Sequence, residues 1–279
     1  MTTKFYGKAE SAANTILNAF KNPNSLPAAL APIFINRHDD VPCRQWSWSN
    51  QMITAIHGHS DARGFRQWQK VGRHVNKGQK SFTILSPVTK KIVDKITQEE
   101  RFAVVGFKGT AVFGLRQTDG DELPPPDPEV AQWIESLPLL AVAKDWGISV
   151  ESYNGQRGRA LGRFSTAGNI ALGVENLSTW CHEMIHAADS RLGNLTERGQ
   201  HWRSETVAEL GGAVLLSVLG RDVDADLGGC WDYVTAYARD AAIEPIAACQ
   251  RVLKRMCDAV ALILDTAATL AEEPAELTA

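Results

Sequence analysis

The chain has 279 residues and a net charge of −3, and 44% of its residues are hydrophobic, which is enough for a substantial core. No segment approaches the length of a membrane span, and the first thirty residues lack the continuous apolar run of a signal peptide. The five cysteines are an odd number without a CxxC pair, which favours reduced thiols over a disulfide framework. We therefore expect a soluble, cytoplasmic protein without a membrane partner.

The first part of the chain mixes helical and strand patterns. Apolar positions recur along residues 4–21 and predict a first helix, which a proline-rich stretch follows. Val/Phe-rich segments with glycine breaks predict strands. Further helices are expected at 47–60 and 63–70, strands at 82–86, 102–107 and 110–115, and a polar hairpin excursion at 90–101.

A proline run marks a boundary between two modules. Pro124, Pro125 and Pro126 are consecutive and stiffen a connector. The balance of charge also changes sign there: residues before 124 carry 17 Lys+Arg and 10 Asp+Glu, and the rest carry 12 and 22, so +7 and −10 give the total of −3. We predict two domains, 1–123 and 124–279, with different partners.

The second module reads as mainly helical. A helix is expected at 128–146, two strands at 159–164 and 169–172, and helices over the remaining segments up to about residue 270. The first module is expected to be a small mixed α/β domain with a curved antiparallel sheet. The predicted fold class is therefore α+β.

The sequence His182-Glu183-Met184-Ile185-His186 is an HExxH motif. On a helix, positions i and i+4 share one face, so both imidazoles can bind one ion while Glu183 acts as catalytic carboxylate. Asn176 or Ser178 can cap this helix, and Gly193 can end it. The alternative is a half-buried helix whose histidines are satisfied within the protein.

A third metal ligand is expected on the following helix, from Trp202 to Leu219, which ends at Gly220. Catalytic zinc takes three protein ligands, and Glu205 and Glu209 share one face there. We assign Glu205 as the ligand and Glu209 as the carboxylate that orients a histidine, with the reverse assignment left open.

The Gly211-Gly212 pair on the same helix favours close helix approach, against Ala187 and Ala188. His201 and Asp189 are expected to have structural roles. Zinc is the expected ion, with another divalent ion such as Mn²⁺ as the alternative.

The first module carries a basic, aromatic stretch. From Ala62 to Val93 there is no acidic residue, and eight are basic. Cationic side chains can follow a phosphate backbone while aromatic rings stack on unpaired bases. The alternative is that the tryptophans are core and the cations a solvated face. The candidate single-stranded DNA contacts are Trp46, Trp48, Asn50, Arg63, Phe65, Trp68, Lys70, Arg73, Lys77 and Lys80.

Two blocks of the chain resemble the ArdC-type antirestriction proteins. The first runs from Trp48-Ser-Asn-Gln through Asp61-Ala-Arg-Gly-Phe-Arg-Gln-Trp to Val75-Asn-Lys-Gly-Gln-Lys. The second joins the HExxH motif to Glu205-Thr-Val-Ala-Glu-Leu-Gly-Gly-Ala. The resemblance implies a single-stranded-DNA-binding N-terminal domain, a zincin-like metallopeptidase domain, and a mobile-element protein that protects incoming DNA from restriction. The chain departs from the family at Ala187-Ala-Asp189, where Trp-Thr-Gly is common.

Three functions compete at this level. The protein is a DNA-bound metalloprotease acting on a host protein, a DNA-coating antirestriction protein with a non-catalytic zincin scaffold, or a peptidase whose first domain recognises the substrate. For a peptidase, Tyr153, His201 and Tyr233 are the candidate oxyanion donors. A monomer is expected.

Overall fold

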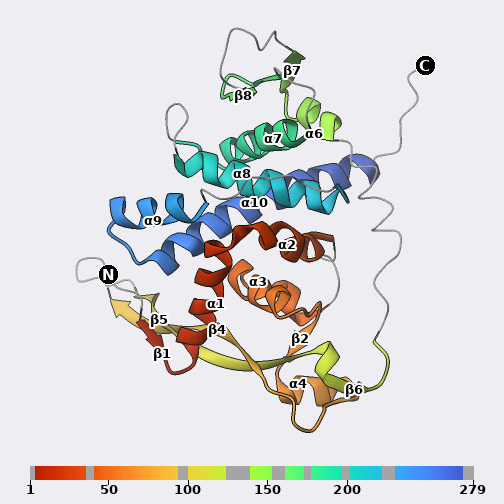
Figure 1. The fold of residues 1–279 in the computed structure, drawn as a ribbon, viewed down its shortest axis with the longest axis vertical. Coiled ribbons are helices and arrows are strands. Elements are labelled where there is room, and N and C mark those ends of the chain that lie inside the picture. The colour runs from red at the N-terminus through yellow and green to blue at the C-terminus, as the bar shows by residue number, and fades with distance from the viewer. Residues whose placement is uncertain are drawn as a thin grey trace.

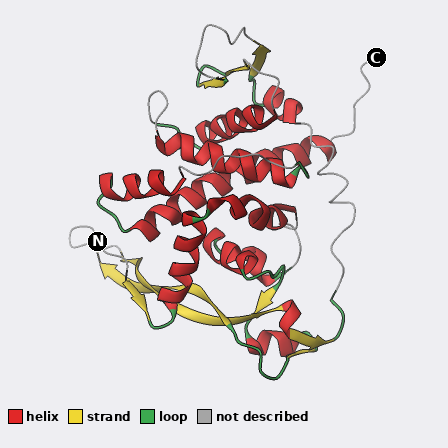
Figure 2. Cartoon of the chain, viewed as in Figure 1, coloured by secondary structure: helices red, strands yellow, loops and turns green. Residues whose placement is uncertain are grey.

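The computed structural model describes residues 4–35, 41–93, 100–123, 139–152, 161–172, 177–196, 202–221 and 230–272. Within them, most helices lie between strands that gather at the two ends of the molecule (Figure 2). This is a mixed α/β architecture with several small sheets and a helical C-terminal region, in agreement with the predicted class. Among the described residues, no helix combines the length and apolar composition that a membrane span requires.

The N-terminal half builds a sheet around one long strand. β5 pairs in parallel with β1 and antiparallel with β2 and β4, and β3 pairs with β6. The strands are β1 (Lys4–Tyr6), β2 (Ala62–Arg63), β3 (Arg73–Val75), β4 (Phe82–Val93), β5 (Glu100–Gly114) and β6 (Thr118–Gly120). The α-helices are α1 (Ala9–Lys21), α2 (Leu26–Ile35), α3 (Trp48–Ile56) and α4 (Phe65–Lys70), and the short 3-10 helices are η1 (Pro23–Ser25), η2 (Pro42–Gln45) and η3 (Leu115–Gln117).

The C-terminal half contains a small sheet of order β7-β9-β8, with α6 and α7 beside it (Figure 1). The strands are β7 (Ser149–Ser152), β8 (Gly162–Ser165) and β9 (Asn169–Leu172). α6 (Leu139–Asp145) precedes them, and α7 (Leu177–Arg191), α8 (Trp202–Val218), α9 (Cys230–Asp240) and α10 (Pro245–Glu272) follow.

Three sequence expectations for the N-terminal half need correction. Residues 4–6 form a strand rather than the start of a helix, because Gly7 turns the chain at φ 58° and Phe5 stacks on Phe107. The strands expected at 102–107 and 110–115 are one strand. Gly109 does not break it but makes room for α1, since a Cβ there would lie 2.9 Å from the Ala9 nitrogen. The proline-rich stretch contains α2, whose buried apolar face outweighs Pro32 inside it.

In the C-terminal half, the ends of α7 and α8 agree with the predicted stops at Gly193 and Gly220, both at positive φ. The strand β7 was not predicted. Of the helix expected at 128–146, residues 128–138 lie outside the described part, and so do residues 94–99 of the predicted hairpin excursion.

The two halves share one apolar core in the described residues. α2 packs on α8, and α1 and α3 pack on α10 (Figure 1). Buried side chains such as Phe20, Leu30, Leu215 and Leu264 belong to one cluster. The division at residue 124 therefore stays a prediction, and the two parts are closely packed. All five cysteines are buried and unpaired, as expected for thiols used as apolar residues.

A buried ion pair locks α7 to α10. The Arg255 guanidinium donates to both carboxylate oxygens of Asp189, with Nε at 2.8 Å from Oδ1 and 2.9 Å from Oδ2. Asp189 is completely buried. This gives Asp189, which follows the HExxH motif, the structural role expected for it.

We expect Asp189→Ala to lower the free energy of unfolding by about 3 kcal/mol, because it leaves a largely buried guanidinium without its carboxylate. Lys254→Ala is the matched control on α10: its ammonium is 72% exposed and pairs with Asp258, so the change should cost less than about 1 kcal/mol. Urea denaturation monitored by circular dichroism measures both. Equal costs would contradict the assigned role of the Asp189–Arg255 pair.

Candidate metal centre

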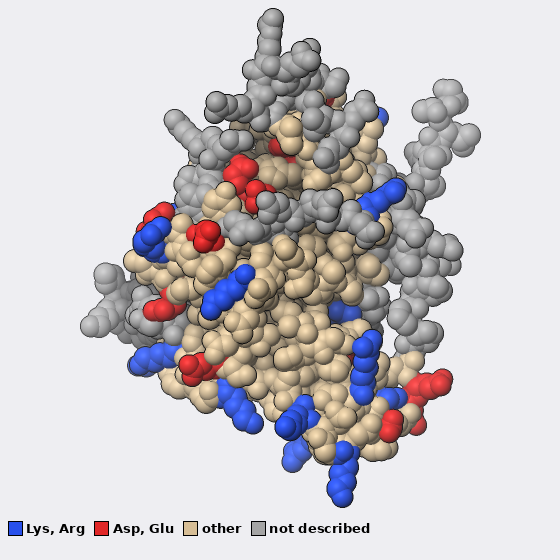
Figure 3. Space-filling model, in the orientation of Figure 1, with Lys and Arg blue, Asp and Glu red and all other residues tan. Residues whose placement is uncertain are grey.

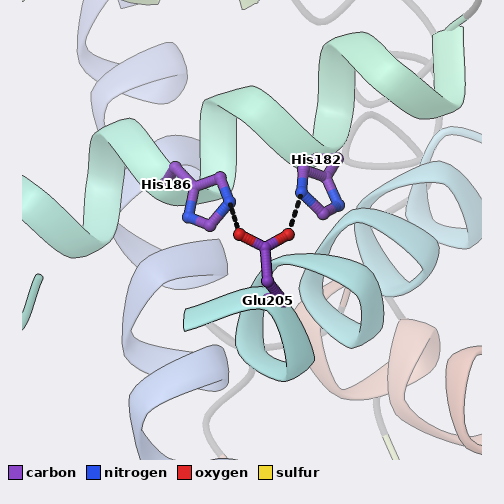
Figure 4. Close-up of side chains that lie close together, drawn as sticks. All are labelled: His182, His186 and Glu205. Carbon is purple, nitrogen blue, oxygen red and sulfur yellow. Dashed lines mark ion pairs between the residues drawn. The ribbon is translucent and has the colours of Figure 1, made fainter. Parts of the chain in front are cut away.

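The HExxH residues lie on α7 and meet one carboxylate from α8. Figure 4 shows His182 and His186 side by side on α7, with Glu205 pointing up at them from α8. The His182 Nε2 atom is 3.4 Å from Glu205 Oε2, and the His186 Nε2 atom is 3.6 Å from Glu205 Oε1. The two rings are 4.8 Å apart at 78°, which leaves both Nε2 atoms directed at the carboxylate. The i,i+4 spacing on one helix therefore works as predicted.

These three side chains have the geometry of a metal site. Their ligand atoms all lie within 4.8 Å of one another. Bond lengths of 2.0–2.2 Å in a tetrahedral zinc site place neighbouring ligand atoms about 3.4 Å apart, close to the two N–O distances above. The donor set of two imidazoles and one carboxylate suits zinc and also other first-row divalent ions. The residues present thus fit a divalent ion bound by His182, His186 and Glu205.

The carboxylate that faces the histidines is Glu205, not Glu209. Burial alone would raise the pKa of Glu205, but the hydrogen bonds and charges of His182 and His186 outweigh burial and lower this pKa to about 2. Glu205 is thus held as the anion that a metal ligand must be. Glu209 lies one turn further along α8, near the start of α9. Burial, together with the charge of Glu209, raises the pKa of the Cys230 thiol there to about 12.

Glu183 is buried beneath the edge strand β8. It is only 4% exposed, and burial, helped by the charge of Glu205 and opposed by His182, raises its pKa to about 7. The backbone N–H of Phe164 in β8 hydrogen-bonds to it. Gly162 allows this approach, because a Cβ there would lie 2.8 Å from Glu183 Oε1 and 2.6 Å from Thr179 Cγ2. No sequence pattern singles out Phe164 or Gly162 as part of the site, since Gly162 is only a glycine within a predicted strand.

Close packing of α7 on α8 brings the ligands together. A Cβ on Gly212 would lie 3.1 Å from the backbone nitrogen of His182, and a Cβ on Gly211 would lie 3.0 Å from the end of the Ile185 side chain. The glycine pair thus permits close approach, as the sequence predicts, but it does so at His182 and Ile185 rather than at Ala187 and Ala188.

The other residues that the sequence singled out near the site are not among the three ligands. Cys181 is completely buried, and burial raises the pKa of its thiol to about 12, consistent with a core residue. Tyr233 is half-buried on α9. His201, Tyr153 and Asn176 lie outside the described residues, so the oxyanion donor stays a prediction.

The candidate DNA contacts separate into buried and exposed residues. Trp68 is completely buried and donates to the Phe113 carbonyl at 2.9 Å. Asn50 exchanges two 2.8 Å hydrogen bonds with the Leu85 backbone, and Arg63 pairs with Asp61 beneath the Trp68 ring. These three cannot meet a base without opening the fold, so in this structure they stabilise the domain.

Arg73 is also used within the protein, where it donates to Thr118 and to the Gly120 and Asp121 carbonyls. Phe65, in contrast, is 50% exposed, and three lysines near it in the sequence are exposed. The lysines are Lys70, Lys77 and Lys80. Trp46 and Trp48 are half-buried beside α10.

Comparison with solved structures identifies the fold. The chain matches the metal-free crystal structure of the antirestriction protein ArdC from plasmid R388 with a TM-score of 0.53 and 20% identity, covering 90% of this chain and 98% of that one. It matches the Mn(II)-bound structure of the same protein with a TM-score of 0.57 and 18% identity, covering 94% and 99%. No protein-family model matches the chain, and no curated protein matches it by sequence. The chain has an ArdC-type fold over almost its whole length.

We expect Glu205→Gln to weaken divalent metal binding by more than about 100-fold, beyond the 10–100-fold typical of residues that only support a ligand. Glu209→Gln, one turn away on α8, is the matched control and should lose about tenfold or less. Zinc and manganese affinities measured by competition with a chromophoric chelator decide between them. The reverse order of effects would make Glu209 the ligand.

The two glycines of α8 offer a second matched pair. Alanine at either position should favour the helix by about 1 kcal/mol. Gly212→Ala presses on the His182 backbone, which cannot move aside, so metal affinity should fall about tenfold. Gly211→Ala meets the Ile185 side chain rather than the backbone of a ligand residue, and its metal affinity should stay near wild type. Equal metal affinities would show that the contact at Gly212 does not position the ligands.

Proposed function

We propose that this protein is an antirestriction protein of a plasmid or related mobile element. In this proposal it binds single-stranded DNA through its N-terminal half and carries a zincin-like metal centre in its C-terminal half. The observation that carries the proposal is the meeting of His182, His186 and Glu205 within a fold that spans nearly the full length of the plasmid R388 antirestriction protein. The protein would act in the cytoplasm as a monomer, where incoming DNA meets restriction enzymes.

The exposed basic residues near α4 support a DNA-binding surface. Figure 3 shows Lys and Arg side chains along the lower end of the molecule, where β4 and α4 lie. The Phe65 ring meets the Phe113 ring edge-on, with the ring centroids 6.3 Å apart. Because Phe65 is half-exposed, part of its ring surface is open to solvent. We assign the surface to Phe65, Arg66, Lys70, Lys77 and Lys80, all of them exposed.

Single-stranded DNA is the proposed form because an exposed phenylalanine among lysines suits stacking on unpaired bases better than reading a duplex groove. The buried Trp68, Asn50 and Arg63 would support this surface from within. Arg73 would hold β3 to β6 beside it.

The metal centre is proposed to be of the metallopeptidase type. When bound by His182, His186 and Glu205, a zinc or manganese ion would supply a Lewis acid for hydrolysis. Glu183, buried beside His182, would accept a proton and pass it to the leaving amine. β8 is an edge strand of its sheet and lies next to Glu183, so an extended peptide could pair with it there.

Two candidate uses of this centre follow. The buried Glu183 beside an edge strand favours cleavage of a host protein, for which the N-terminal half would deliver the enzyme to DNA or recognise the substrate. The large core that the two halves share favours a scaffold that presents the DNA-binding surface. The two differ in whether protection from restriction needs Glu183.

We expect Glu183→Gln to keep the fold and to bind metal within a few-fold of wild type, while any peptide hydrolysis is lost. Hydrolysis of casein by the zinc-loaded protein is the first readout, and retained hydrolysis would exclude the assigned role. Transfer efficiency of unmodified plasmid DNA into a restricting host is the second. Lost protection would favour the cleavage function, and full protection would favour the scaffold.

We expect the double variant Lys77→Gln/Lys80→Gln to bind single-stranded DNA more weakly and with a flatter salt dependence. Each phosphate contact contributes about 0.7 to the slope of log K against log salt, so the slope should decrease by about 1.4. Lys144→Gln removes one exposed positive charge on α6, outside this surface, and is the control. Anisotropy titrations of labelled oligo(dT) at several salt concentrations measure this. An unchanged slope would remove the two lysines from the interface.

A further inference from the structure

One face of the N-terminal sheet carries exposed cationic and aromatic side chains where β1 joins β5. Tyr6 of β1 lies beside Lys108 of β5 in parallel register. Two residues earlier on each strand, Lys4 lies beside Gly106. Paired residues share a face of a sheet, and so do residues two apart on one strand, so these four residues lie on one face. Tyr6 is 45% exposed, and both lysines are exposed.

Gly106 lets the Tyr6 ring lie close against the sheet. A Cβ on Gly106 would be 2.8 Å from Tyr6 Cε2 and 2.5 Å from the Lys4 carbonyl oxygen, so a larger residue would displace β1. β1 is held from the opposite face, where Phe5 stacks on Phe107 with the ring centroids 6.0 Å apart. The Tyr6 ring is therefore supported by the sheet while nearly half of the residue is open to solvent. An aromatic ring placed in this way can stack on another planar ring.

β4 adds a third exposed lysine, Lys90, to the same face. Val88 of β4 pairs with Gly106, and the register shifts after it so that Thr89 pairs with Val104. The extra residue at this shift is on β5, so β4 keeps its alternation and Lys90 shares the face of Val88. β1, β4 and residues 102–114 of β5 contain no Asp or Glu. This face therefore has a strong local excess of positive charge.

The combination of an exposed ring with three lysines fits a flexible polyanion that carries planar groups. Phosphates of a single strand can follow the lysines while an unpaired base stacks on the ring. A duplex keeps its bases stacked inside, so it would leave the ring unused. The opposite face of the same strands differs: there Phe102, 74% exposed, lies two residues from Val104, 56% exposed, so that the exposed ring has an apolar neighbour.

We propose that this face, the β1–β5 platform, is a second contact for single-stranded DNA, with a base stacked on the aromatic ring and phosphates at the lysines. The platform consists of Lys4, Tyr6, Lys90 and Lys108. The choice of DNA as the partner rests on the proposed function.

The β1–β5 platform is separate from the surface near α4. Phe65 of that surface contacts Phe113, which is five residues beyond Lys108 on β5, or about 17 Å along the strand. Figure 1 shows β1 toward one end of the long sheet and α4 toward the other. A strand bound at both places would therefore run along the sheet.

The test compares variants of the full-length protein in anisotropy titrations with labelled oligo(dT) at several salt concentrations. Tyr6→Phe keeps a stacking ring and Tyr6→Leu keeps only apolar bulk, so the pair separates stacking from packing. Phe102→Leu removes an exposed ring from the opposite face and is the matched control. Lys4→Gln/Lys108→Gln removes two charges of the platform and tests it independently if Tyr6→Leu is unstable. Thermal unfolding by circular dichroism shows which variants are folded.

Tyr6→Leu should weaken oligo(dT) binding about tenfold, as for the loss of one stacked base, while Tyr6→Phe and Phe102→Leu stay within about threefold of wild type. Lys4→Gln/Lys108→Gln should lower the slope of log K against log salt by about 1.4.

Weaker binding by the double lysine variant with unchanged binding by a folded Tyr6→Leu would indicate a general polyanion surface, such as one for an acidic protein segment, and would overturn the stacking platform. If neither variant changes binding while Lys77→Gln/Lys80→Gln weakens it, the platform is overturned and the DNA-binding proposal stands. If the effects are reversed, the platform is supported and the surface near α4 is wrong. If wild type binds no oligo(dT), the proposed function fails and the platform fails with it.

Discussion

The contact between α7 and α8 at Gly212 is the constraint on which the candidate metal centre depends. Without a side chain at Gly212, the α8 backbone can approach His182 within van der Waals distance. Glu205 precedes Gly212 by seven residues, or about two helical turns, so both lie on the same stripe of α8. The stripe that touches α7 therefore also carries the carboxylate to the imidazoles. A bulkier residue at the contact would separate the helices and the ligands together.

The rest of the fold holds that helix pair in place. α10 fixes the end of α7 through the Asp189–Arg255 pair, and α2 from the N-terminal half packs on α8. β8 approaches Glu183 from the opposite side through Gly162. Residues from both halves thus support the metal centre, although only the second half supplies its ligands. In such a molecule the proposed DNA-binding surface and the metal centre are parts of one packed body.

The sequence was most informative where function depends on local spacing. The HExxH motif and the two helix stops at Gly193 and Gly220 follow from local patterns and need no knowledge of tertiary structure. Helical periodicity places Glu205 and Glu209 on one face, and the packing of α8 on α7 brings Glu205 to the histidines. The partner of Asp189 is 66 residues away, so no local pattern could identify Arg255. Composition also cannot tell which residues of a basic, aromatic stretch are buried. Trp68 and Lys70 lie in one such stretch, yet Trp68 is buried and Lys70 is exposed. From the sequence alone, Gly109 reads as a strand break. The close contact with α1 that requires a glycine there forms only when the chain folds.

The central claim is that His182, His186 and Glu205 bind one divalent ion while Glu183 remains free beside it. Anomalous diffraction from crystals soaked in manganese or zinc tests this most directly, because it locates the ion independently of any activity. The account predicts one strong anomalous peak about 2.0–2.2 Å from the two Nε2 atoms and a Glu205 oxygen, with Glu183 outside bonding distance. A peak bound by Glu209 or Glu183 instead of Glu205, or no peak on α7 at saturating metal, would contradict it.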